Sequence, residues 1–148
     1  MTTTRRNFMA TAASISILPR HLFAQAGKPG ANGKLNIAGI GFGGQGASNL
    51  NQVAGAGHAI TALCDVDSAY VAPTVAKYPQ AAFFTDYREL LSKQKDLDAV
   101  VIATPDHTHA VIAAAALKAG KHVFVQKPLC HDIFECRELA RLAKEKNL

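Results

Sequence analysis

The sequence predicts an α/β protein built on a doubly wound parallel sheet, and three observations support this fold class. Short apolar runs alternate with helix-length segments from residue 35 onward, which is typical of parallel strands joined by crossover helices. The run at 99–103 is apolar at every position, as expected for an inner strand covered by helices on both faces. A glycine-rich turn at 41–46 directly follows the first run and opens the first helical segment.

The alternating pattern assigns five strands and five helices. We expect strands near Leu35–Ile40, Ala59–Cys64, Ala81–Thr85, Ala99–Ala103 and His122–Val125. We expect helices near Gly44–Ala54, Ser68–Lys77, Tyr87–Lys93, His107–Ala119 and Asp132–Asn147. Pro73 weakens the second helix. The last helix carries one apolar stripe of Ile133, Cys136, Ala140 and Ala143, flanked by Leu139 and Leu142.

Two acidic residues occupy predicted helix starts. Asp67 precedes the second helix and fits an N-cap role. Asp86 precedes the third, with Glu89 three residues later, which is the spacing of a capping box.

Composition and charge exclude several classes of protein. The 148 residues are 49% apolar and 18% charged, so the chain is neither disordered nor fibrous. Beyond residue 26 there are 13 basic and 11 acidic side chains, a balance too even for a nucleic-acid or membrane-surface binder. No apolar run approaches the ~20 residues of a membrane span, so we expect no stable membrane insertion. Three cysteines are too few for a disulfide scaffold.

The first 26 residues have the pattern of an export signal. Arg5 and Arg6 precede an apolar stretch at 8–18, and Ala24 and Ala26 form an Ala-x-Ala cleavage pattern. The start resembles a twin-arginine signal, whose substrates are typically exported folded and often carry a cofactor; a frayed basic terminus is the alternative. We therefore expect a signal peptide at 1–26, a linker at 27–34 and a domain at 35–148, with a periplasmic or extracellular location reached through the twin-arginine export machinery.

The glycine turn and a following carboxylate predict a dinucleotide site in a Rossmann fold. The turn consists of Gly41, Phe42, Gly43, Gly44, Gln45 and Gly46. Its first glycine permits a tight turn, its second lets the backbone approach a pyrophosphate, and its third lets helix and strand pack closely. Asp65, 19 residues beyond Gly46, ends the second strand and can accept hydrogen bonds from a ribose. NAD is favoured over NADP because a 2′-phosphate would be repelled by Asp65 and no arginine lies at 64–68.

Two further motifs at strand ends resemble the Gfo/Idh/MocA family of oxidoreductases. Thr104-Pro105-x-x-x-His109 follows the fourth strand, and the run at 120–128 reads Gly-Lys-His-Val-Phe-Val-Gln-Lys-Pro. The family typically shows G-x-G-x-x-G, an acidic residue after the second strand, T-P-x-x-x-H and G-K-H-V-x-x-E-K-P. Four motifs in this order, covering 35–148, make the resemblance specific.

The resemblance implies roles for residues at the nicotinamide end of the site. Thr104, Pro105 and His109 would line the nicotinamide side of the cleft, and Lys127 would face both nicotinamide and substrate as the catalytic residue. Its ammonium can donate to a substrate hydroxyl and support a developing alkoxide. Gln126 replaces the family's usual glutamate, which removes a charge partner but keeps hydrogen-bonding capacity. Without the family resemblance, we would interpret Lys127 as a solvated loop lysine.

Other residues have simpler interpretations. Taken without the family, His109 reads as a packing or capping histidine. Cys130, His131 and Cys136 suggest a metal site, but their spacing is wrong and Cys136 lies on the apolar stripe, so we interpret it as a core thiol and expect no metal. A cysteine nucleophile would need an adjacent base, which the sequence does not indicate.

Together, the motifs and the resemblance predict that this chain is the NAD-binding part of an oxidoreductase. It implies hydride transfer between nicotinamide and a hydroxyl carbon of a sugar, cyclitol or derivative. In the family the substrate surface comes from a C-terminal α+β domain, so we expect this chain to be truncated before the last strand and inactive alone, and the full-length protein to be a homo-oligomer. The alternatives are an NAD-dependent glycosidase or epimerase of the same fold, and a non-catalytic regulator that senses NAD or sugar.

Overall fold

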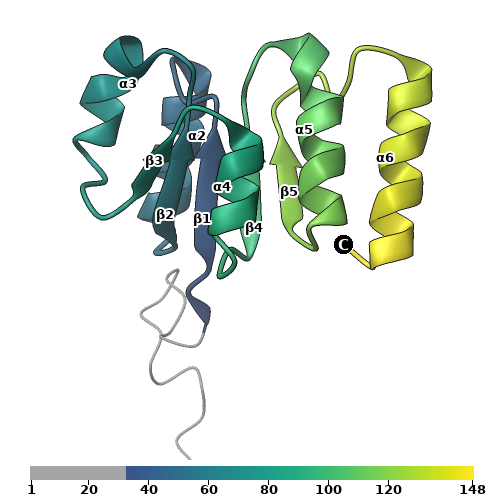
Figure 1. The fold of residues 1–148 in the computed structure, drawn as a ribbon, viewed down its shortest axis with the longest axis horizontal. Helices are drawn as coiled ribbons and strands as arrows, with labels where there is room; N and C mark the ends of the chain where they lie inside the picture. Colours follow the sequence, from purple (N-terminus) through teal and green to yellow (C-terminus); the bar gives the residue numbers. More distant parts are fainter. Residues whose placement is uncertain (1–32) are drawn as a thin grey trace, which may run out of the picture.

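A computed structural model describes residues 33–148, and Figure 1 shows their arrangement. The predicted signal peptide at 1–26 lies outside the described residues, as does most of the predicted linker. Five strands form one parallel sheet in the order β3-β2-β1-β4-β5. The strands are β1 (Asn36–Ile40), β2 (Ala59–Cys64), β3 (Ala82–Phe84), β4 (Ala99–Ile102) and β5 (His122–Val125). The helices are α2 (Gln45–Gly55), α3 (Ser68–Val75), α4 (Tyr87–Lys93), α5 (Asp106–Lys118) and α6 (Ile133–Lys146).

Helices cover both faces of this sheet, which confirms the predicted doubly wound α/β class. On one face α2 and α3 pack through Leu50 and Val71 against Ile37, Leu63 and Val101. On the other face, α4, α5 and α6 pack against the sheet in a larger apolar cluster (Figure 1). The strand side chains that point to this face include Ala38, Ile40, Ala62, Val100 and Ile102. Successive strand residues therefore feed two separate cores, so β1 and β4 must be apolar at nearly every position.

Aspartate side chains start three of the helices. Asp67 accepts a hydrogen bond from the Tyr70 amide at 2.9 Å, and Asp86 accepts one from the Arg88 amide at 2.8 Å, so both predicted N-caps are confirmed. Glu89 instead pairs with Lys93 one turn further on, so the reciprocal half of the capping box is not formed. Helix α3 contains Pro73 and ends at Val75, two residues before the predicted end.

The buried face of α6 differs from the predicted stripe. Leu139 and Leu142 are buried against the α5 side of the core, whereas Ile133 is 71% exposed and Ala140 is exposed. Cys136 and Ala143 of the predicted stripe do pack half-buried against the core, but the stripe was wrong at Ile133 and Ala140 because it was centred on an alanine and left the leucines at its flank. A helix is oriented by the apolar area it buries, and two leucines bury more than an alanine.

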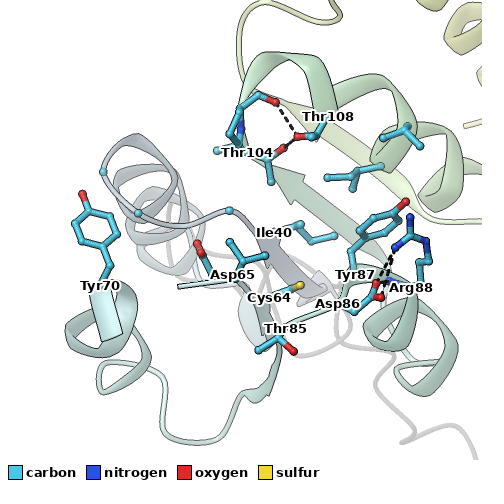
Figure 2. Close-up of a pocket in the computed structure, with 18 residues that line it drawn as sticks. Ile40, Cys64, Asp65, Tyr70, Thr85, Asp86, Tyr87, Arg88, Thr104 and Thr108 are labelled. Carbon is cyan, nitrogen blue, oxygen red and sulfur yellow. Dashed lines mark hydrogen bonds and ion pairs between the residues drawn. The ribbon is translucent and has the colours of Figure 1, made fainter. Parts of the chain in front are cut away.

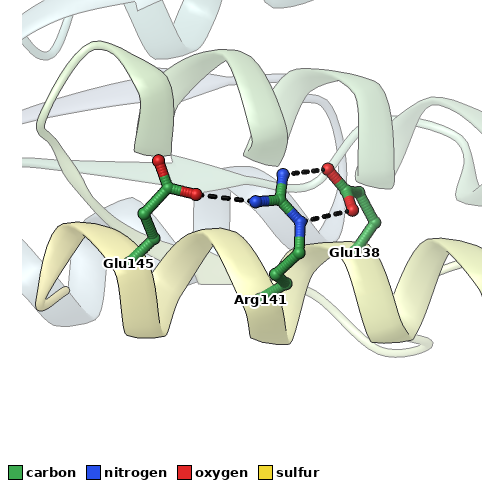
Figure 3. Close-up of polar contacts among 3 residues, drawn as sticks. All are labelled: Glu138, Arg141 and Glu145. Atoms are coloured by element: carbon green, nitrogen blue, oxygen red, sulfur yellow. Dashed lines mark hydrogen bonds and ion pairs between the residues drawn. The ribbon is translucent and has the colours of Figure 1, made fainter.

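The outer face of α6 is charged. Arg141 bridges Glu138 and Glu145 at 2.6 Å each, as Figure 3 shows. The hydrogen bond from Arg141 holds the pKa of Glu138 below its usual value. All three side chains are exposed, so these pairs contribute little to stability and mark the solvent side of the helix. Within residues 33–148, no helix is long and apolar enough to cross a membrane.

The orientation of α6 can be tested by truncating one residue on each face. Leu142→Ala is expected to lower the free energy of unfolding by about 3 kcal/mol, because it removes buried apolar volume that neighbours refill only partly. Ile133→Ala, at an exposed site, should change it by no more than about 0.5 kcal/mol. Urea unfolding followed by circular dichroism measures both, and a larger loss from Ile133→Ala would contradict the assigned orientation.

Candidate dinucleotide-binding site

A cavity of about 800 Å³ opens at the carboxyl ends of β1, β2 and β4. It lies where β1 is flanked by β2 on one side and β4 on the other, the switch point at which open α/β sheets bind ligands. Four chain segments at the ends of β1, β2, β3 and β4 form most of its wall: Gly41, Gly43 and Gly44; Cys64, Asp65, Val66 and Tyr70; Thr85, Asp86, Tyr87 and Arg88; and Ala103, Thr104, Pro105 and Thr108. Figure 2 shows these side chains around the cavity.

Glycine is required at two positions of the turn for reasons of space. Gly41 has φ +72°, and a Cβ there would lie 2.6 Å from the backbone nitrogen of Thr104. A Cβ on Gly46 would overlap the carbonyl oxygen of Gly41. The turn therefore packs directly against the loop after β4 and against the first turn of α2, as the motif predicted.

The start of α2 is left open toward the cavity. Gly44, in the N-cap position, provides no side-chain cap, and the first turn carries no acidic residue. A helix start of this kind offers backbone N–H groups and the positive end of the helix dipole to an anion. The position of Gly43 and Gly44 on the cavity wall places this donor group where a diphosphate can reach it.

Asp65 connects the end of β2 to the glycine turn. One carboxylate oxygen accepts the Phe42 amide at 3.0 Å, and the other accepts the Asp67 amide at 3.1 Å. The side chain is half-buried on the cavity wall (Figure 2). A carboxylate has roughly four acceptor positions, so two remain for ligand hydroxyl groups after these amides are bound.

Two residues of the predicted turn face away from the cavity. The Phe42 ring is fully buried and meets the Phe83 ring edge-on with centroids 6.3 Å apart, so Phe42 belongs to the core and contributes only its backbone. Gln45 donates to Asn49 one helical turn along, at 3.0 Å. Neither side chain lines the cavity.

Several wall residues were not predicted from the sequence. Tyr70 projects from α3 over Gly43, where a Cβ would overlap its ring, and remains 67% exposed (Figure 2). Tyr87 and Arg88 begin α4, with the guanidinium 4.7 Å from the Tyr87 ring centroid and in contact with Asp86. No motif spacing marks these residues. The general rule that parallel strand ends meet at one edge could have pointed to residues 85–88, which follow β3.

Cys64 also lines the cavity without being reactive. Burial raises the pKa of its thiol to about 12, and the negative charges of Asp65 and Asp86 act in the same direction. The thiolate is the nucleophilic form, so at neutral pH this cysteine acts as a small apolar wall residue.

The loop after β4 contributes its predicted residues in two different ways. Thr104 and Pro105 line the cavity, and Thr108 donates to the Thr104 hydroxyl at 2.8 Å. His109 lies behind this wall at 1% exposure, with its ring nitrogens 2.8 Å from the Thr104 carbonyl oxygen and 2.6 Å from that of Pro128. The structure thus makes His109 a support for the wall, as the packing interpretation predicted, and does not place it on the cavity surface.

The loop after β5 carries Gln126 and Lys127. The Gln126 amide donates to the Ile102 carbonyl at 2.8 Å and continues the β4 pairing. Lys127 is exposed, and the peptide bond to Pro128 is cis. Neither Gln126 nor Lys127 is among the cavity-lining residues, so their direct role in binding stays a prediction.

Cys136 is not the free core thiol predicted from the sequence. It forms a disulfide with Cys130, across a separation of six residues and a Cα–Cα distance of 6.0 Å. The spacing was misjudged because residues 131–132 turn the chain back at the start of α6, where Asp132 caps the helix and Glu135 accepts the His131 amide. The disulfide fastens the loop that follows Lys127 to α6. Among residues 33–148, no group of three or more His, Cys, Asp or Glu side chains is placed to hold a metal ion.

The chemistry of the cavity fits a dinucleotide. The open α2 start suits a diphosphate, Asp65 suits a ribose, and the surface formed by Ile40, Val111 and Ile112 suits a flat apolar base. Six predicted residues line the cavity, namely Gly41, Gly43, Gly44, Asp65, Thr104 and Pro105, and the other six do not line it, namely Phe42, Gln45, Gly46, His109, Gln126 and Lys127.

Comparison with known proteins agrees with this site. The family described as an oxidoreductase family with an NAD-binding Rossmann fold (GFO_IDH_MocA) matches residues 35–148. A glycosyl hydrolase family 109 protein of Solibacter usitatus is 40% identical over 124 residues, covering 76% of this chain and 28% of that protein. Inositol 2-dehydrogenase of Salmonella typhimurium is 33% identical over 117 residues, covering 77% of this chain and 34% of that protein.

Solved structures give the same result. An NAD binding oxidoreductase from Klebsiella pneumoniae matches with a TM-score of 0.69 and 32% sequence identity, covering 78% of this chain and 33% of that one. The chain therefore spans between 28% and 34% of the length of these three proteins.

The close packing of the turn predicts a sharp difference between two glycines of α2. Gly46→Ala is expected to lower the free energy of unfolding by about 2 kcal/mol, because the new methyl must displace the Gly41 backbone. Gly55→Ala has open space and should be neutral or stabilising by about 0.5 kcal/mol. Thermal unfolding of both variants is the measurement, and equal stability of the two would contradict the assigned packing.

Proposed function

This chain belongs to the Gfo/Idh/MocA family of oxidoreductases with an NAD-binding Rossmann fold, and from that membership we propose that it is the cofactor domain of an NAD-dependent oxidoreductase. The substrate we propose is a sugar, a cyclitol or a derivative of one. The observation that carries the proposal is Asp65, which lies on the cavity wall and is tied to the glycine turn. The inositol 2-dehydrogenase relative supports a polyhydroxylated substrate.

We assign the protein groups distinct tasks in binding. The α2 start holds the diphosphate, Asp65 accepts from the ribose hydroxyls, and the Thr104 loop forms the wall toward the nicotinamide. Bound NAD supplies a hydride acceptor at its nicotinamide ring. Close packing at Gly41 and Gly46 lets the turn bring backbone donors near the phosphates.

Lys127 is the proposed catalytic residue. When the substrate carbon gives its hydride to the nicotinamide, the hydroxyl proton leaves to water, and the Lys127 ammonium donates a hydrogen bond to that oxygen and stabilises the negative charge that develops on it. Lys127 is exposed in the loop that follows β5, so its side chain is accessible to a ligand. Gln126, next to it, offers an amide where a carboxylate would have added negative charge.

A second candidate is an NAD-dependent glycosidase. The glycosyl hydrolase family 109 relative, at 40% identity, favours it. In such an enzyme hydride would be removed from the sugar and returned, so product would form without net NADH. An assay of the full-length enzyme distinguishes the two activities. Sugar-dependent absorbance of NADH supports the dehydrogenase, whereas glycoside cleavage with unchanged NADH absorbance supports the glycosidase.

NAD binding through Asp65 can be tested by calorimetry on the chain. Asp65→Asn is expected to weaken NAD binding about tenfold, because the amide offers fewer acceptors to the ribose, while NADP binding weakens less or improves once the negative charge is gone. Asp96→Asn, at an exposed site away from the cavity, is the matched control. An unchanged ratio of NAD to NADP affinity in Asp65→Asn would reject this assignment.

We also propose export by the twin-arginine route to a periplasmic or extracellular location. The support is the sequence of residues 1–26, with Arg5 and Arg6 ahead of the apolar stretch.

A fusion of residues 1–26 to a folded fluorescent reporter tests the export proposal. The reporter should reach the periplasm of a host with a working twin-arginine system, and Arg5→Lys combined with Arg6→Lys should retain it in the cytoplasm. Fractionation followed by fluorescence measures the distribution. Export of the doubly substituted fusion at the original level would rule out this route.

A further inference from the structure

His109 connects two loops that carry different parts of the proposed site. Its ring is the one buried polar or charged side chain in residues 33–148, at 1% exposure. Nδ1 lies 2.6 Å from the carbonyl oxygen of Pro128, and Nε2 lies 2.8 Å from that of Thr104. The first carbonyl belongs to the loop after β5 and the second to the loop after β4.

Both partners of the ring are acceptors, so the ring must donate. A neutral imidazole donates from one nitrogen, and the protonated ring donates from both. Either form binds at least one of the loops through α5, which holds His109 in its first turns. Removing the ring leaves the part-buried carbonyl oxygens of Thr104 and Pro128 without this partner, which is more costly than losing a fully exposed hydrogen bond.

The position of the Lys127 loop depends mainly on the hydrogen bond between His109 and the Pro128 carbonyl. The loop is fixed before Lys127 by the bond from the Gln126 amide to Ile102, and after it by the disulfide at Cys130. Between these two points, the described part of the chain has one hydrogen bond from the segment 127–129 to the rest of the protein, and it is the bond between Pro128 and His109.

The other nitrogen acts on the cavity wall. Thr104 lines the cavity with its side chain and presents its carbonyl to His109 behind the wall. The ring therefore lies between the Lys127 loop and the Thr104 wall, within hydrogen-bond distance of both.

We infer that His109 is a positioning residue that places Lys127 against the Thr104 wall of the cleft. This inference rests on the proposed function, which assigns the nicotinamide end of the cofactor to that region. His109 does not line the cavity, so it acts through the two loops and does not touch the cofactor.

Amide side chains can separate the two contacts of the ring. An asparagine amide nitrogen occupies about the position of Nδ1, and a glutamine amide nitrogen about that of Nε2. His109→Asn should therefore keep the bond to Pro128, His109→Gln should keep the bond to Thr104, and His109→Leu should lose both. His107→Leu, at an exposed position of the same helix, is the matched control.

The first readout is the backbone order of the Lys127 and Leu129 amides, measured by NMR relaxation on the chain without ligand. In the unsubstituted chain we expect order parameters of about 0.85, falling toward about 0.6 in His109→Leu and His109→Gln. His109→Asn and His107→Leu should retain the original values. If His109→Leu does not fold, the Asn and Gln variants still decide the question.

The second readout compares NADH with ADP-ribose, which lacks the nicotinamide. By calorimetry, His109→Leu should bind NADH about tenfold more weakly and ADP-ribose within about twofold of the unsubstituted chain. His109→Asn should restore NADH binding. Equal loss of both ligands would show a general structural role and overturn the inference.

The inference is also overturned if the loop stays ordered in folded His109→Leu, or if the Asn and Gln variants behave alike. Failure of the proposed function looks different. In that case the unsubstituted chain binds neither NADH nor ADP-ribose, and the relaxation measurement alone decides whether His109 positions the Lys127 loop.

Discussion

The hydrogen bond from the Phe42 amide to the Asp65 carboxylate, at 3.0 Å, is the contact on which the rest of the site depends. It joins the end of β2 to the glycine turn that follows β1, so the group suited to a ribose and the groups suited to a diphosphate are held at a fixed separation. Phe42 secures the contact from the other side, because its ring is buried against Phe83 in the core below the turn. The binding geometry is thereby fixed by the fold before any ligand arrives.

The loops after β4 and β5, at the end of the site assigned to nicotinamide, are held by different contacts. There the two loops after β4 and β5 are held together by the buried ring of His109, and the second loop is also fastened to α6 by the disulfide between Cys130 and Cys136. The adenosine half of the site is thus fixed by the bond between Asp65 and the glycine turn, whereas the half assigned to nicotinamide and substrate is fixed by His109 and the disulfide. The contacts of His109 and the disulfide can change between related sequences without altering the sheet. This suits the end of the site that would determine the reaction.

The sequence predicted the parts of this structure that have short-range causes. The bounds of β2, α4 and β5 were predicted to the residue, and Gly41 and Asp65 were placed on the cavity wall because tight turns and strand ends leave a local pattern. Tyr70 and Arg88 were missed because they reach the cavity only through the packing of distant segments. The disulfide was missed because the turn before α6 brings its cysteines together. The predicted buried face of α6 was displaced around the helix because helical spacing alone does not weigh leucine against alanine.

An NMR titration of the chain with NAD, followed at every backbone amide, tests whether the glycine turn and Asp65 form the dinucleotide site. We predict the largest shifts at Gly43, Gly44 and Gln45, where the helix start faces the cavity, together with shifts at Val66 and Thr104 on its walls. The Phe42 amide should remain protected from hydrogen exchange throughout, since its bond to Asp65 persists in the complex. Shifts confined to another surface, or loss of Phe42 protection as NAD binds, would contradict the account.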